Sequence, residues 1–324
     1  MDVTLTQLRY FVEAAGCLSM TAAARNLTVA QSAVSASVAH LERQIGTQLF
    51  IRQRSKGLVL TPAGELFLHD ARAVLAHMEE VLEHAQGERE SVKGRVRLMC
   101  FTTLAPLLLP GLLARLNEEH PGLEVAVTEA DASGCAAALP TGQADMALTY
   151  DLGMPAGVAT TKVDQARPYV AMPAGHRLAR RTSVALTELR GEPFVLLDLP
   201  HSRELMVSLL QGVGVEPVVR FRSASFETVR TFVANGHGFA LLHQRPRHAM
   251  TYDGGRVATV EIEDDVPSLD IVLAHLRTQR FTARMRAVAQ AVRQQVQHNR
   301  AGVDSSPAVV GQPVDDLMHQ VPLA

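Results

Sequence analysis

Two groups of residues have types and spacing that could recognise another molecule. The first is the stretch "AQSAVSASVAHLERQIG" (residues 30–46), where apolar residues at helical spacing leave a second face of small polar side chains. Glutamine, serine and alanine side chains can reach base edges in a DNA major groove without holding the helix backbone away. The same small residues could instead line a contact between two helices.

The second group consists of hydroxyl, aromatic and basic residues that follow expected strands. Ligands of open α/β sheets bind beyond the carboxyl ends of strands, where helix N-termini favour anions. Hydroxyl donors together with Arg203 suit a small carboxylate, and Tyr150 and Phe226 offer apolar or stacking walls. Each of these residues could equally be a helix cap or loop filler. The predicted ligand-binding residues are Thr102, Thr103, Ser133, Tyr150, His201, Ser202, Arg203, Ser225 and Phe226.

The elements that must position the first group are three helices and a hairpin. Apolar spacing predicts a helix over residues 6–15 that Gly16 ends, followed by a short alanine-rich helix capped by Ser19. The third helix begins either at a Thr28 capping box or at Ala30. The segment "LFIRQRSKGLVLT" then predicts two short strands around a basic turn, which is typical of a wing.

Charge reverses after this hairpin. Residues 1–60 contain six basic and three acidic side chains, whereas residues 61–90 contain two basic and seven acidic ones. Thr61 and Pro62 are suited to begin a long acidic helix. Its apolar seam could pair with a second helix, or the helix could lie on its own domain. The predicted seam is Leu68, Ala71, Leu75, Met78, Leu82 and Ala85, with Phe67, Val74 and Val81 beside it.

From residue 93 onward, strands alternate with helices, which predicts a parallel sheet. Two such cycles, followed by a return of the chain to the first, predict two α/β lobes joined by two crossings. The expected strands are 96–100, 123–128, 145–150, 169–172, 194–197, 218–222, 239–243 and 269–274. The expected helices are 105–119, 134–141, 202–213, 226–235 and 282–297, and the tail after residue 300 is expected to be disordered.

Several function classes are disfavoured. The three cysteines and thirteen histidines follow no metal-ligand or disulfide spacing, and neither Gly-x-Ser-x-Gly nor His-Glu-x-x-His occurs. "GVG" at 212–214 follows a helix and is typical of a helix stop. We therefore predict no catalytic residue, metal or cofactor. No stretch approaches the roughly 18 apolar residues of a membrane span. A solute-binding receptor would share the two lobes, but it would lack residues 1–90 and carry an export signal.

Residues 21–65, "TAAARNLTVAQSAVSASVAHLERQIGTQLFIRQRSKGLVLTPAGE", resemble the winged helix-turn-helix of LysR-type transcriptional regulators, and the likeness extends to about residue 297. The matching residues are Ala23-Ala24, Leu27, Gln31-Ser32-Ala33-Val34-Ser35, Leu41-Glu42, Gly46, Leu49-Phe50, Arg52, Leu60-Thr61 and Gly64. The resemblance implies that Gln31, Ser32, Ser35 and Ala36 face bases, and that Arg52, Arg54 and Lys56 lie along the DNA backbone. Ala36, Ser37 and Ala30 depart from the common pattern, so DNA shape would supply more of the specificity.

The resemblance also implies the fold class and the domains. The fold class is α/β: a winged helix-turn-helix (1–61), a linker and dimerisation helix (62–92), a two-lobed effector domain similar to periplasmic binding proteins (93–300) and a disordered tail (301–324). Lobe I takes about 93–164 and 265–300, and lobe II takes 165–264.

The function implied is that of a cytoplasmic, sequence-specific regulator that binds double-stranded DNA at an imperfect inverted repeat. It would be a homodimer, or a homotetramer made as a dimer of dimers, with RNA polymerase as a further candidate partner. Its effector would be a small organic anion bound between the lobes, near Thr103, which matches a commonly contacted hydroxyl position. A narrower alternative keeps the regulator and makes it a redox sensor that uses Cys100 and Cys135.

Overall fold

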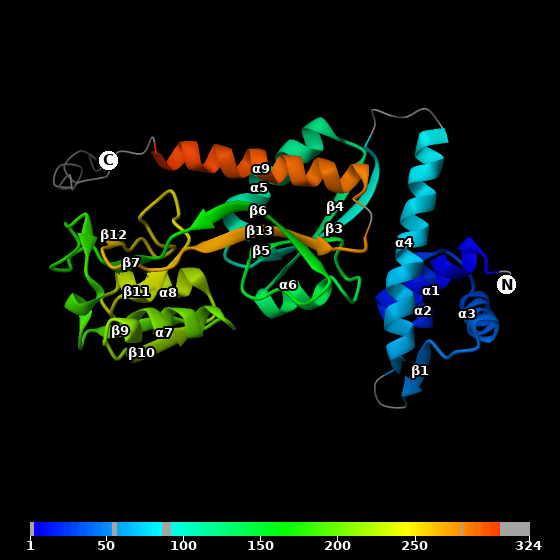
Figure 1. The fold of residues 1–324 in the computed structure, drawn as a ribbon, viewed down its shortest axis with the longest axis horizontal. Helices are drawn as coiled ribbons and strands as arrows, with labels where there is room; N and C mark the ends of the chain where they lie inside the picture. The colour runs from blue at the N-terminus through cyan, green and yellow to red at the C-terminus, as the bar shows by residue number, and fades with distance from the viewer. Residues whose placement is uncertain (1–2, 54–56, 86–91, 280, 305–324) are drawn as a thin grey trace, which may run out of the picture. The chain divides into compact units, whose positions relative to one another are not determined.

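The computed structural model describes residues 3–53, 57–85, 92–279 and 281–304. The described residues form two compact units: unit 1 consists of those within 3–165 and 270–292, and unit 2 of those within 166–269 and 293–304. Figure 1 shows the ribbon with the element labels used below. Of the helices described, none has the length and apolar character that a membrane crossing requires.

Unit 1 opens with three helices and a hairpin, as the sequence predicts. The helices are α1 (Leu5–Cys17), α2 (Met20–Asn26) and α3 (Gln31–Ile45), and the antiparallel strands are β1 (Phe50–Gln53) and β2 (Gly57–Leu60). Ser19 caps α2 by accepting a hydrogen bond from the backbone N–H of Ala22. Gly46 ends α3 with φ of 75°, in the left-handed region that glycine adopts without a steric penalty.

One local prediction was wrong, and the structure decides between two alternatives for another. Gly16 lies inside α1, which ends instead at Cys17 and is followed by Leu18 in a left-handed conformation. Thr28 does not cap α3, because its backbone has φ of 55° and its N–H donates to the carbonyl of Arg25 in the turn after α2. Ala30 takes the cap position, with no side-chain hydrogen bond.

The long helix α4 (Pro62–Ala85) follows Thr61, whose hydroxyl accepts from the N–H of Gly64 at 2.9 Å. The predicted seam does not form one face. Leu68 and Ala71 are 3% and 2% exposed and belong to the core that α1 and α3 also fill. The apolar side chains that α4 exposes are Leu66, Val74, Met78 and Val81. Leu82 and Ala85 have side chains outside the described set.

The remainder of unit 1 is a five-stranded sheet in the order β4-β3-β5-β13-β6, with β3 parallel to both neighbours and β13 antiparallel to β5. Its strands are β3 (Gly94–Phe101), β4 (Leu123–Ala130), β5 (Met146–Tyr150), β6 (Val158–Ala166) and β13 (Leu269–Leu276). The helix α5 (Ala105–Glu119) covers one face and α6 (Ala132–Ala138) the other (Figure 1). The last helix, α9 (Ala283–Asp304), runs four residues into the tail that was expected to be disordered, whereas residues 305–324 lie outside the described part of the chain.

Unit 2 contains a second set of strands and helices around its own core. The sheet order is β11-β7-β12-β8, and β9 pairs in parallel with β10. The elements are β7 (Tyr169–Pro173), β8 (Ser183–Val184), the 3-10 helix η1 (Leu186–Leu189), β9 (Pro193–Leu197), α7 (Ser202–Gly212), β10 (Val218–Ser223), α8 (Phe226–Ala234), β11 (Ala240–Leu242) and β12 (Val257–Ile262). The strands β6, β8 and β12 were not predicted. For β6 the reason is its largely polar, half-exposed sequence at the sheet edge.

The backbone of Gly64 approaches the carbonyl of Leu49 so closely that a Cβ there would lie 2.1 Å from that oxygen. Gly64→Ala should therefore lower the free energy of unfolding by about 1–3 kcal/mol, as over-packing typically does. Gly16→Ala is the matched control: it lies in helix α1 with nothing within 4 Å of the position that a Cβ would take, so it should leave stability unchanged or raise it by about 1 kcal/mol. Thermal or urea unfolding measures both. Equal stability of the two variants would contradict the close approach.

Candidate functional site

The small polar face of α3 is open. Gln31, Ser32 and Ala36 are exposed, whereas Val34, Val38 and Leu41 on the opposite face are buried in the core. The side-chain amide of Gln31 donates to the hydroxyl of Ser35 at 2.9 Å, so these two groups form one polar surface. The alternative in which the small residues line a helix–helix contact does not hold, because the buried valines and leucine make that contact instead.

The wing is attached to α3 by one carboxylate. Glu42 accepts hydrogen bonds from the backbone N–H groups of Leu49 and Phe50, at 2.8 and 3.0 Å. This role of Glu42 is not apparent from local spacing, although Glu42 is one of only three acidic residues among residues 1–60. Arg52 lies in β1 opposite Leu58. Its side chain and the predicted backbone contacts Arg54 and Lys56 lie outside the described residues.

In unit 1, the ends of three neighbouring strands bring predicted ligand residues together. Thr102 and Thr103 follow β3, and Ser133 lies in the first turn of α6 after β4. The N–H of Thr102 donates to the carbonyl of Ala130 at 3.0 Å, which joins the two loops. Thr103 is 7% exposed, Thr102 is half-buried and Ser133 is exposed. Hydroxyl groups that differ in exposure therefore lie together beyond the carboxyl ends of β3 and β4.

Tyr150, at the end of β5, is buried. It is 3% exposed, and its ring meets that of Phe101 edge to face with centroids 5.0 Å apart. Tyr150 therefore packs inside unit 1 and does not present an open stacking surface. At the end of strand β4, Asp131 accepts a hydrogen bond from the N–H of Gly134 and so caps α6.

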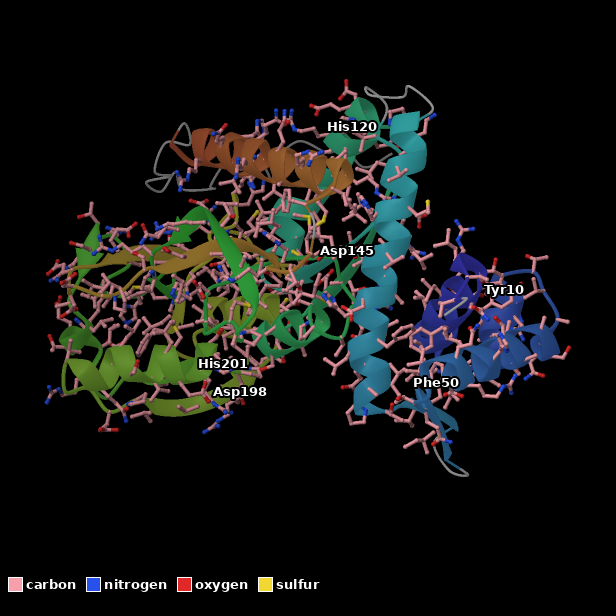
Figure 2. The ribbon with its side chains drawn as sticks, turned by 45° about the vertical axis from the view of Figure 1, so that its right-hand side comes forward. Tyr10, Phe50, His120, Asp145, Asp198 and His201 are labelled. Atoms are coloured by element: carbon pink, nitrogen blue, oxygen red, sulfur yellow. The ribbon has the colours of Figure 1, made fainter. Side chains whose placement is uncertain are left out.

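In unit 2, the other predicted residues gather where the parallel strands β9 and β10 end. The two ends are joined by a hydrogen bond from the N–H of Asp198 to the carbonyl of Ser223 at 2.9 Å. Figure 2 shows Asp198 close to His201, which precedes α7 with φ of 64°. Ser202 is buried, and Ser225 caps α8 by accepting from the N–H of Thr228, so the capping alternative applies to Ser225. Phe226 begins α8 and is half-buried.

Arg203 is exposed, but its charge is already balanced. Its guanidinium donates to Glu204 at 2.8 Å and to Asp198 at 3.0 Å. The hydrogen bond with Glu204 is the main cause of a raised pKa of Arg203, and the charges of Glu204 and Asp198 add to it. A ligand carboxylate would have to compete with both side chains for the same N–H groups.

The two cysteines of the redox alternative, Cys100 and Cys135, are buried free thiols that form no disulfide with each other. Burial raises the pKa of Cys100 far above the usual range, and the neighbouring Cys135 adds to the shift. Burial likewise raises the pKa of Cys135 to about 12. Oxidation by peroxide proceeds through the thiolate, which these environments suppress at neutral pH. Burial of both thiols therefore disfavours the redox alternative.

Comparison with known proteins gives consistent matches along the chain. The family model of the lysR-family bacterial regulatory helix-turn-helix protein matches residues 5–65, and that of the LysR substrate binding domain matches residues 89–297. A probable hydrogen peroxide-inducible genes activator of Mycobacterium avium is 33% identical over 74% of this chain and 78% of its own length.

Two solved structures extend the comparison. HinK, a LysR family transcriptional regulator from Pseudomonas aeruginosa, is 35% identical with a TM-score of 0.61, covering 91% of this chain and 99% of its own. A full-length OxyR variant from the same organism is 25% identical with a TM-score of 0.75, covering 90% of this chain and 98% of its own. Each similarity spans both the helix-turn-helix and the α/β domain.

Proposed function

Because this chain belongs to the LysR family of transcriptional regulators, and is thus a DNA-binding regulator with an effector-binding domain, we propose that α3 reads an imperfect inverted repeat of double-stranded DNA. The observation that carries the proposal is the open polar face of α3, held to the wing by Glu42. Such a face fits the major groove, because its short side chains let the helix backbone approach the base edges.

The proposed contacts divide between bases and phosphates. Gln31 and Ser35, which already share a hydrogen bond, are oriented to contact base edges together with Ser32 and Ala36. Arg52, Arg54 and Lys56 of the wing supply backbone contacts, which position the protein without reading sequence. The target DNA also implies a cytoplasmic location.

Dimerisation is proposed to use the exposed apolar stripe of α4. Leu66, Val74, Met78 and Val81 are 72%, 49%, 36% and 46% exposed and recur at helical spacing. A second copy of the helix laid on this stripe would remove it from water and present two copies of α3 to two half-sites. Two such dimers would make the tetramer, and RNA polymerase remains a proposed partner of the DNA-bound form.

The effector is proposed to be a small organic anion held by the hydroxyl groups at the strand ends of unit 1. Thr102, Thr103 and Ser133 lie near the first turns of α5 and α6, and helix N-termini favour negative charge. At α6, the carboxylate of Asp131 already accepts a hydrogen bond from one N–H group of the N-terminus, that of Gly134. The strand ends of unit 2 contribute His201, Ser202, Ser225 and Phe226 as further candidates. Because Asp198 and Glu204 engage Arg203, we give the hydroxyls the larger share of the binding.

Gln31→Ala should relax sequence preference, since one base-edge contact is worth about 1–3 kcal/mol of discrimination. Arg52→Ala should weaken binding on every sequence and reduce the salt slope by about one. The control is Arg190→Ala, an exposed arginine of unit 2, which should change neither. Genome-wide selection of bound fragments, followed by salt titration on the enriched site, measures both effects. The proposal fails if no motif with two-fold symmetry is enriched.

Replacing Val74 and Val81 with glutamate should convert the dimer to monomer, because like charges would face each other across the paired helices. The monomer should then bind a full inverted repeat at least tenfold more weakly. Val218→Glu is a matched control, because this valine is 53% exposed in unit 2. Sedimentation velocity gives the mass of each variant. A double variant that sediments as the wild type would exclude this face of α4.

Thr103→Val keeps the shape of the side chain and removes its hydroxyl, so it should weaken the response to the inducing carboxylate about 3- to 10-fold. A thermal-shift screen of small carboxylates identifies that compound, because binding to the folded state raises the melting temperature. Thr187→Val, at an exposed position of η1, is the control. The Cys100→Ser, Cys135→Ser double variant should respond normally. If it alone loses its response, the redox alternative replaces this proposal.

A further inference from the structure

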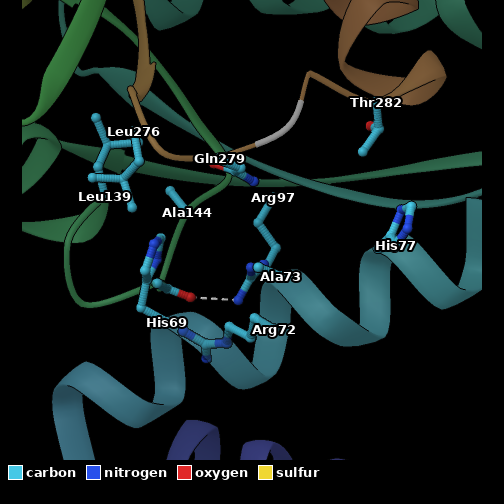
Figure 3. A pocket seen from close by; sticks show the side chains of 11 residues that line it. His69, Arg72, Ala73, His77, Arg97, Leu139, Ala144, Leu276, Gln279 and Thr282 are labelled. Carbon is cyan, nitrogen blue, oxygen red and sulfur yellow. Dashed lines mark hydrogen bonds between the residues drawn. The ribbon is translucent and has the colours of Figure 1, made fainter.

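A cavity of about 50 Å³ lies where the linker helix α4 meets the sheet edge of unit 1. Its polar wall comes from His69, Arg72 and His77 of α4, together with Arg97 of β3. Figure 3 shows His69 and His77 toward its two ends, with Arg97 reaching toward α4 from the sheet. Since one water needs about 10–15 Å³ of such space, the cavity has room for a small polyatomic ion.

Arg97 already pairs with a carboxylate. Its guanidinium forms a two-point ion pair with Asp145, and it also donates to the carbonyl of Gly142. Two of its five N–H donors are not used by these bonds. Both ionic side chains are mostly buried, with 28% and 19% exposed. The negative charge of Asp145 is therefore already committed to Arg97.

Arg72 lacks such a partner. Its Nη1 donates to the carbonyl of Thr141 at 3.0 Å, but its Nε is buried with no hydrogen-bond partner. Within the part of the chain that the structure describes, no carboxylate forms an ion pair with Arg72. Burial, and then the positive charge of Arg97, lower the pKa of Arg72 to about 10, and the charges of Asp145 and Glu13 offset only part of that shift. Arg72 thus stays charged at neutral pH beside a like charge.

The groups around the cavity select for an anion. None of the described residues that line it is a carboxylate, whereas the two arginines, two histidines, Gln279 and Thr282 can all donate hydrogen bonds. Buried guanidinium groups normally have an anionic partner, and an oxyanion offers several acceptor oxygens in a small volume. We propose that this cavity is a second ligand site that binds a small oxyanion of the phosphate class, with Arg72 as its principal cationic ligand.

The position of the site suggests what binding does. An anion there would contact α4 through Arg72 and the sheet through Arg97, and would so add to the existing hydrogen bonds from Arg72 to Thr141 and between His69 and Thr278. Phosphate would then stabilise the contact between the linker helix and the sheet of unit 1. This inference does not depend on the DNA or effector proposals, because binding is measured on the protein alone.

The test titrates the full-length protein with inorganic phosphate at constant ionic strength, by calorimetry and by thermal shift. The wild type should bind one phosphate per chain with a saturable rise in melting temperature. Phosphate also stabilises proteins by exclusion from their surface, but that effect does not saturate. Ribose 5-phosphate forms a second arm, because tighter binding than that of inorganic phosphate would identify a phosphate ester as the ligand.

Arg72→Gln should weaken phosphate binding at least tenfold. Arg115→Gln is the matched control, since the Nε of Arg115 is also buried without a partner but Arg115 pairs with Glu119 away from the cavity. If Arg72→Gln fails to fold, His77→Gln, at an exposed position of α4, should weaken binding several-fold. Absence of saturable binding to the wild type, or an unchanged affinity in a folded Arg72→Gln variant, would overturn the proposal.

Discussion

The hydrogen bonds at Leu49 hold the DNA-binding part together as one piece. Its N–H donates to Glu42 of α3 at 2.8 Å, and its carbonyl accepts from the N–H of Thr61 at 3.0 Å. Gly64 of α4 packs directly against that carbonyl. Leu49, at the start of the wing, therefore contacts α3 through Glu42 and the start of α4 through Thr61 and Gly64.

The helix α4 has three faces with different surroundings. One face, with Leu68 and Ala71, completes the core of the helix-turn-helix, and a second, with Val74, is apolar and exposed. The third bears His69 and Arg72 and meets the sheet of unit 1. Because one helix carries all three faces, an anion at the proposed site would act on the element that also packs in the helix-turn-helix core and bears the exposed apolar side chains.

The strand ends of the α/β domain combine structural and binding roles. Asp131 caps α6 and Ser225 caps α8, whereas Thr103 carries a hydroxyl on a buried loop and caps neither of these helices. Cys135 lies in α6, where burial raises its pKa to about 12, and it packs as an apolar side chain. One relative of this chain is a probable hydrogen peroxide-inducible genes activator. In this chain, the two cysteines near the proposed effector site, Cys100 and Cys135, are buried.

The sequence by itself determined the order and type of most elements, because caps such as Ser19 and Thr61 and apolar spacing act within a turn or two. It also predicted that one face of α3 is polar and open. Only the tertiary structure decided how a helix divides its faces and which charges remain unbalanced. The guanidinium of Arg72 meets Thr141, which is 69 residues away, and the apolar seam of α4 splits between core and surface. Such outcomes depend on partners that are distant in the chain, which local spacing cannot specify.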